Sequence, residues 1–108
     1  SDDQWTRAKG FDSFCPLGPY IDTEFDPSSG AIGSQINGET KQEGDLSLME
    51  RSVAELVEYA SSVFTLLPGD VLLTGTPAGV APLSAGDEVV CAISGLGQLR
   101  NPVVAAEA

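Results

Sequence analysis

Histidine is absent from this chain of 108 residues, and basic side chains are scarce, with 5 Lys and Arg against 16 Asp and Glu. Without an imidazole, the chain cannot supply the base of a Ser-His-Asp or Cys-His relay, nor a histidine ligand to a metal. The formal net charge of −11 argues against nucleic acid or an anionic membrane surface as a partner, because both require clustered Lys and Arg. We therefore expect neither kind of partner.

Cysteines and long apolar runs are also rare. Cys15 and Cys91 are too far apart in the sequence for a CxxC metal or redox motif. We expect them to be reduced core thiols of a cytoplasmic protein, with one disulfide as the alternative. No run approaches the roughly 20 apolar residues of a membrane-spanning helix. Hydrophobic residues still make up 42% of the chain, which predicts a folded protein rather than a disordered one.

Glycine and proline divide the first third of the chain into short pieces, which predicts strands and turns there rather than a helix. Asn37-Gly38 is the strongest short-range signal for a hairpin turn, here between strands at 34–36 and 39–42. Gly-Asp turns precede apolar runs at 71–74 and 89–93, which predict two more strands, each buried on both faces. Together these patterns predict roughly six to eight short strands.

One helix is predicted after the hairpin. Ser47 is a suitable N-cap, Glu50 completes a capping box three residues later, and Pro68-Gly69 stops the helix. Apolar residues recur at intervals of three and four, which places them on one face. This stripe consists of Val53, Leu56, Val57, Ala60 and Phe64. The chain is therefore predicted to be mostly β with one helix covering a sheet, an α+β fold.

The loop at 74–80 is the most suggestive segment for chemistry. Gly75 and Gly79 can expose backbone amides, and Thr74 and Thr76 add hydroxyl donors, a combination that suits a carboxylate or an enolate oxygen. A tight structural turn is the alternative.

Lys9 is the second candidate, because it is one of few cations in an acidic chain. An enclosed lysine could bind an anionic substrate or act as an acid or base. The alternative is an ordinary surface lysine.

Acidic residues around the hairpin raise the question of a metal site. Glu39, Glu43 and Asp45 are close together in the sequence, and hard cations prefer oxygen ligands. Gly44 suggests an exposed turn, so solvated surface charge is the alternative.

Three ordered stretches resemble the C-terminal half of the catalytic domain of the fumarylacetoacetate hydrolase superfamily. They are QWTRAKGFDSFCPLGP at 4–19, INGE with Gln42 at 36–42, and LPGDVLLTGTPAGV at 67–80, followed by GDEV at 86–89. The resemblance implies a mixed β-roll, incomplete in this chain. It also implies that residues 1–108 are the C-terminal portion of a single domain with no internal boundary.

The resemblance further implies a hydrolase or decarboxylase that uses Mg²⁺ or Mn²⁺. Its substrate would be a small 2-oxo or β-diketo acid, such as an acylpyruvate, fumarylpyruvate or oxaloacetate, with C–C cleavage through a metal-stabilised enolate. An isomerase of the 2-hydroxyhepta-2,4-diene-1,7-dioate type is one alternative. A non-catalytic β-module used for binding or assembly is the other.

By position, Lys9 resembles the family's active-site lysine, and Gly75 and Thr76 resemble its substrate-binding loop. The family's metal ligands, a Glu-x-Glu pair and an Asp, are expected upstream of Ser1, so this chain contributes no metal ligand. The implied partners are the N-terminal portion of the same domain and a second copy in a homodimer. This chain alone is expected to be inactive.

Overall fold

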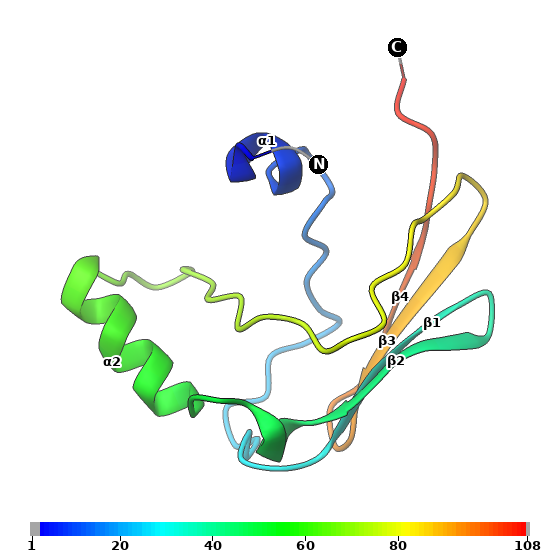
Figure 1. Cartoon of the computed structure of the whole chain (residues 1–108). Helices are drawn as coiled ribbons and strands as arrows, with labels where there is room; N and C mark the ends of the chain where they lie inside the picture. Colours follow the sequence, from blue (N-terminus) through cyan, green and yellow to red (C-terminus); the bar gives the residue numbers. More distant parts are fainter. Residues whose placement is uncertain (1–2, 108) are drawn as a thin grey trace.

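Four antiparallel strands form the sheet of residues 3–107, which are the residues that the computed structural model describes. The strands are β1 (Ala31–Ile36), β2 (Glu39–Asp45), β3 (Glu88–Ile93) and β4 (Gly97–Pro102). The helices are α1 (Trp5–Lys9), the short 3-10 helix η1 (Leu46–Leu48) and α2 (Val53–Val63). The strand order is β2-β1-β3-β4 (Figure 1). These elements and the solved relatives described below confirm the predicted α+β class.

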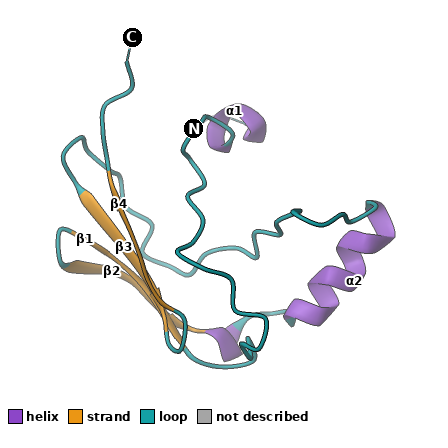
Figure 2. Cartoon of the chain, turned by 180° about the vertical axis from the view of Figure 1, so that it is seen from behind, coloured by secondary structure: helices purple, strands orange, loops and turns teal. Residues whose placement is uncertain are grey.

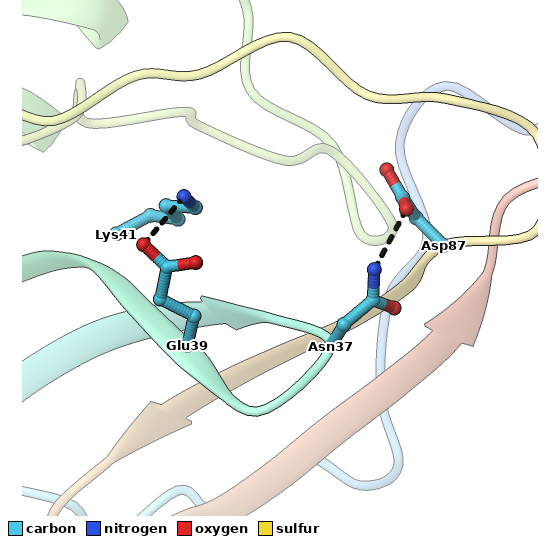
Figure 3. Close-up of polar contacts among 4 residues, drawn as sticks. All are labelled: Asn37, Glu39, Lys41 and Asp87. Atoms are coloured by element: carbon cyan, nitrogen blue, oxygen red, sulfur yellow. Dashed lines mark hydrogen bonds and ion pairs between the residues drawn. The ribbon is translucent and has the colours of Figure 1, made fainter.

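The predicted hairpin is present as β1 and β2. Asn37 and Gly38 have φ values of 51° and 81°, the positive values that a two-residue turn of this kind requires. The Asn37 side chain donates to Asp87 Oδ1 at 2.8 Å (Figure 3). It also accepts from the backbone N of Glu88 at 2.9 Å. The turn is therefore tied to the start of β3, although the two segments are 50 residues apart in the sequence.

The strand predicted at 89–93 is confirmed as β3, but the one predicted at 71–74 is wrong. Residues 71–74 form an irregular segment outside the sheet, with no ladder partner among residues 3–107. Burial on both faces is also wrong for β3, where only Val90 is buried. The sheet of four strands is smaller than predicted, because a strand needs a neighbour to complete its backbone hydrogen bonds.

Helix α2 is confirmed, but its N-cap is Ser52 and not the predicted Ser47. Ser52 Oγ accepts from Glu55 N at 3.2 Å, and Ser52 N donates to Glu55 Oε2 at 2.7 Å. Ser47 lies instead in η1, where its backbone N donates to Asp45 Oδ1 at 2.9 Å. The pattern Ser-x-x-Glu occurs twice, five residues apart. Asp45 caps η1, which contains the serine of the first pattern, so only the second pattern starts α2.

The short helix α1 contradicts the prediction of a first third without helix. Gln4 accepts a hydrogen bond from Thr6 N at 3.4 Å, and the helix stops at Gly10. The first glycine is Gly10 and the first proline is Pro16, so the residues before them are free to form a helical turn.

The two cysteines are free, as predicted, but they are exposed rather than part of a core. Cys15 lies in the irregular segment after α1, and Cys91 lies on β3. No helix between residues 3 and 107 has the length and apolar character needed to cross a bilayer.

Most apolar side chains of the described residues are exposed, and only Ala60 and Val90 are buried. The chain exposes 8785 Å², whereas a compact folded chain of its mass would expose about 5,700 Å². Its radius of gyration is 15.2 Å, compared with about 13 Å for a compact chain of this length. Figures 1 and 2 show the reason, because α1 and α2 stand away from the sheet on long connections.

Large exposed apolar residues gather outside the sheet. On α1 and the segment after it they are Trp5, Phe11, Phe14, Leu17, Tyr20 and Ile21. On α2 and the segment that follows they are Val57, Tyr59, Val63, Phe64, Leu67, Val71, Leu72, Leu73, Val80 and Leu83. Exposed large apolar side chains in such numbers are typical of a surface that another protein segment covers.

Candidate functional site

The loop at 74–80 lies directly against strand β2. A Cβ atom on Gly79 would be only 2.0 Å from the carbonyl oxygen of Lys41. A Cβ atom on Gly44 would be 3.3 Å from Cβ of Pro77. Gly79 also has a φ of +100°, which favours glycine. Glycines on both segments therefore allow the loop to approach the strand closely.

Gln42 of β2 connects this loop to the sheet through its side-chain amide. Its Nε2 lies 2.7 Å from Thr76 Oγ1 and 2.8 Å from the carbonyl oxygen of Pro77. Its Oε1 accepts from Ser34 Oγ at 2.9 Å. Ser34 is the register partner of Gln42 across the hairpin. The predicted site residue Thr76 is thus held in place from β1 and β2.

An open cavity lies beside the loop, between the end of β2, η1 and the start of α2. Gly75 and Thr76 line it on the loop side, so the structure brings these two predicted residues to one cavity. Leu46, Met49 and Leu56 contribute apolar surface. An apolar cavity with a few polar groups at its wall is the usual form of a small-molecule site.

The charges around this cavity are mostly negative. Glu43, Asp45 and Glu50 line it, and Arg51 is the only basic residue among the described residues that do so. An anionic ligand would therefore depend on Arg51 and on the hydroxyl and backbone donors of the loop. The sequence reasoning did not single out Arg51, and the Ser52 cap that starts α2 beside it is the signal that could have placed it here.

Asp45 has a structural role at the cavity rim. Hydrogen bonds from the Ser47 side chain and backbone lower the pKa of Asp45, and its Oδ1 accepts from Ser47 N at 2.9 Å. The carboxylate is therefore engaged as the cap of η1.

The acidic residues of the hairpin do not form a metal site. Within residues 3–107, no three Asp, Glu or Cys side chains converge on a position that could hold an ion. Glu39 pairs with Lys41 Nζ at 2.9 Å instead (Figure 3). The hypothesis of a site made of Glu39, Glu43 and Asp45 is wrong, and the described residues do not fit Mg²⁺ or Mn²⁺ on their own.

Lys9 is not brought to the loop within this chain. It ends α1, and its Nζ lies 4.6 Å from the ring centroid of Trp5. Trp5 is 71% exposed, and α1 stands apart from the sheet in both views (Figures 1 and 2). A catalytic role for Lys9 stays a prediction.

The chain thus combines a four-stranded antiparallel sheet with a glycine-bearing loop held against one of its strands. A comparison with protein-family models finds a match, described as fumarylacetoacetate (FAA) hydrolase C-terminal, over residues 1–104. The chain therefore belongs to the fumarylacetoacetate hydrolase family, as the resemblance predicted.

Three relatives carry names that describe chemistry. The 5-carboxymethyl-2-hydroxymuconate delta-isomerase of Mycobacterium smegmatis is 52% identical, with a TM-score of 0.92 over 95% of this chain. The fumarylpyruvate hydrolase of Pseudomonas aeruginosa, solved with Mn²⁺ and pyruvate, is 45% identical, with a TM-score of 0.69 over 72% of this chain. The mitochondrial oxaloacetate tautomerase Fahd2a of Rattus norvegicus is 43% identical over 111 residues, or 94% of this chain.

Each of these proteins is much longer than the chain. The chain spans 41% of the isomerase, 34% of the hydrolase and 36% of the tautomerase. The similarity therefore concerns less than half of each relative.

Proposed function

We propose that this chain is the C-terminal portion of a fumarylacetoacetate hydrolase-type catalytic domain that acts on a small 2-oxo or β-diketo acid. The observation that carries the proposal is the Gly75–Thr76 loop, held over β2 and lining a cavity. Its hydroxyl and backbone amides suit the carboxylate or oxo oxygen of such an acid.

The names of the three relatives support this class of substrate. Oxaloacetate, fumarylpyruvate and a 2-hydroxymuconate each carry an oxo group, or its enol, next to a carboxylate. Negative charge on the enolate oxygen is the feature that cleavage, decarboxylation and tautomerisation of such acids share. Stabilising that charge with fixed donors lowers the barrier of each reaction.

Within this proposal, the residues of the chain have separate tasks. Thr76 and the Gly75 backbone anchor the substrate carboxylate. Lys9 comes to the cavity when α1 is packed by the missing part of the domain, and its ammonium then offsets the developing enolate charge. Hydrolysis of an acylpyruvate would place that charge on the departing pyruvate.

The proposal assigns the divalent ion to another part of the domain. Residues 3–107 contain no ligand cluster, so the carboxylates that bind Mg²⁺ or Mn²⁺ would belong to the N-terminal portion. A bound dication stabilises negative charge on an oxo oxygen. The Mn²⁺ in the fumarylpyruvate hydrolase supports the use of a divalent ion.

The same N-terminal portion is the proposed occupant of the exposed apolar surface. The chain exposes 8785 Å², about 3,000 Å² more than a compact chain of its mass. This excess is more than one partner contributes to a standard interface, about 800 Å², and it suits a domain completed by a second segment. A homodimer of the completed domain and a cytoplasmic location remain predictions.

Isomerase activity is the second candidate. The isomerase of M. smegmatis exceeds the hydrolase in both identity and TM-score, which favours enol–keto interconversion without bond cleavage. A binding module without catalysis is the remaining alternative, and the same experiment separates all three.

The test joins this chain to the N-terminal portion of the M. smegmatis isomerase. The chimera is supplied with Mg²⁺ or Mn²⁺ and with acetylpyruvate or oxaloacetate. Pyruvate release reports cleavage or decarboxylation, and loss of the enol absorbance without pyruvate release reports tautomerisation. We expect turnover that EDTA abolishes, and none from either portion alone.

Two further results bear on the alternatives. A chimera that folds but turns over none of these acids would support the binding module and would contradict the enzyme proposal. Binding of a hydrophobic dye should be strong in the chain alone and weak in the chimera. Equal dye binding would contradict the proposed covering of the apolar surface.

A further inference from the structure

The chemistry of its neighbours fixes the orientation of the Gln42 amide. The carbonyl oxygen of Pro77 can only accept a hydrogen bond, so the Gln42 atom 2.8 Å away must be the amide nitrogen. The amide oxygen then faces Ser34, whose hydroxyl donates to it at 2.9 Å. Both residues are half-buried.

This orientation determines the direction of the hydrogen bond at Thr76. The amide nitrogen carries two hydrogens, and the second one points to Thr76 Oγ1 at 2.7 Å. The Thr76 oxygen is therefore an acceptor, and its own hydrogen is left to donate. Its contact with the carbonyl oxygen of Pro77 is 3.5 Å long, too long to compete with a substrate oxygen.

We infer that Gln42 is a positioning residue that holds the Thr76 hydroxyl as a hydrogen-bond donor toward an anionic oxygen of the substrate, and that Ser34 orients Gln42. The inference rests on the proposed function, in which Thr76 binds a 2-oxo acid. A carboxylate or enolate oxygen can only accept hydrogen bonds. A hydroxyl whose hydrogen is already engaged would present lone pairs to that oxygen and repel it.

The neutrality of Gln42 is part of this role. Glu43, Asp45 and Glu50 already line the cavity. A carboxylate at position 42 would accept the Thr76 hydrogen and would add another negative charge. When protonated, the same carboxyl group could donate again, which makes the effect reversible with pH.

The test measures KM and kcat of the chimera described above, with Gln42→Glu compared with the unchanged sequence. At about pH 8 we expect KM for the 2-oxo acid to rise about tenfold or more, the effect of losing one hydrogen bond to a charged group. As the pH falls to about 4, just below the ordinary Glu pKa of about 4.3, the new side chain protonates and KM should return toward that of the unchanged sequence at the same pH. The matched control is Gln98→Glu on β4, which adds the same charge at an exposed position and should show neither effect.

A second measurement follows the loop without relying on activity. Gln42→Met keeps the side-chain length but removes both donors, so the NMR order parameters of the backbone N–H groups at 75, 76, 78 and 79 should fall toward the values below about 0.6 that mark a flexible segment. Ser34→Ala leaves the donors in place and should have a smaller effect. Unchanged order parameters in Gln42→Met would show that Gln42 does not hold the loop and would overturn the inference.

Unchanged KM in Gln42→Glu at about pH 8, or a defect that does not diminish as the pH falls to about 4, would also overturn the inference while leaving the proposed function standing. Absence of turnover in the unchanged chimera is a different result. It removes the proposed function and the substrate-directed part of the inference together. The order parameters of the loop then decide whether Gln42 positions it.

Discussion

Gly79 and Lys41 meet so closely that the space between the loop and β2 has no room for a side chain. A Cβ atom on Gly79 would be 2.0 Å from the carbonyl oxygen of Lys41. The two residues are 38 positions apart in the sequence. Their contact sets the distance between the loop at 74–80 and the sheet.

Replacement of Gly79 by Ala should therefore displace the loop. We expect a loss of about 1 to 2 kcal/mol from the positive φ and about 1 to 3 kcal/mol more from the clash, measured by urea unfolding. Gly69→Ala is the matched control, because Gly69 has a φ of +94° and nothing within 4 Å of its added Cβ. Equal losses in the two variants would show that the contact with Lys41 does not constrain the loop.

Replacement of Ser52 by Ala should weaken α2. Ser52 is the N-cap and forms a capping box with Glu55, and loss of such a cap costs about 1 kcal/mol. Circular dichroism during thermal unfolding should register the loss. Ser47→Ala should leave helix content unchanged, because Ser47 lies in η1. A larger loss of helix in Ser47→Ala than in Ser52→Ala would show that the helix begins at Ser47, as the sequence predicted.

The turn before β3 should be sensitive to acid. A backbone hydrogen bond from Ser84 and a side-chain hydrogen bond from Asn37 lower the pKa of Asp87. The folded state thus binds this proton less readily than the unfolded state. The stabilisation is complete above the unfolded pKa of about 3.9 and is lost as the pH falls through the lower folded pKa.

Asp87→Asn tests this dependence. We expect it to lower the unfolding free energy at neutral pH and to reduce the further loss between about pH 4 and pH 2. Asn37→Ala removes the side-chain hydrogen bond but keeps the larger contribution of the Ser84 backbone, and it should give an intermediate acid dependence. Identical acid dependence in the original and Asp87→Asn proteins would contradict the assignment.

Replacement of Lys9 by Met should lower kcat of the chimera about 100-fold or more, the range expected for loss of an electrostatic or acid–base group, without changing its unfolding midpoint. Lys41→Met is the control for loss of a positive charge, because Lys41 pairs with Glu39 on the hairpin. It should keep kcat within about twofold, as expected for an exposed pair. An unchanged kcat in Lys9→Met would remove Lys9 from the mechanism.

Local signals in the sequence predicted the elements that depend on neighbouring residues. Asn37-Gly38 gave the hairpin because its positive φ values are a property of those two residues. The apolar stripe predicted α2 correctly, but the choice between Ser47 and Ser52 depended on Asp45, whose side chain engages the first signal. Such a competition between overlapping caps cannot be resolved from spacing alone.

The candidate site shows the same division. The glycines and hydroxyls of the loop pointed to Gly75 and Thr76, and both line the cavity. The sequence marks Gln42 only as part of a family motif, because its contact with Thr76 joins residues 34 positions apart. The segment at 71–74 has strand-like composition but no neighbouring strand among residues 3–107.

By itself, the sequence determined the α+β class, the family and the charge that argues against nucleic acid, because these depend on composition and on contiguous motifs. Only the tertiary structure decided that the loop at 74–80 rests on β2, that Gln42 orients the Thr76 hydroxyl, and that Glu39, Glu43 and Asp45 do not converge. The physical reason is that hydrogen-bond direction and ligand convergence depend on distances between segments remote in the chain, and only the folded backbone sets those distances.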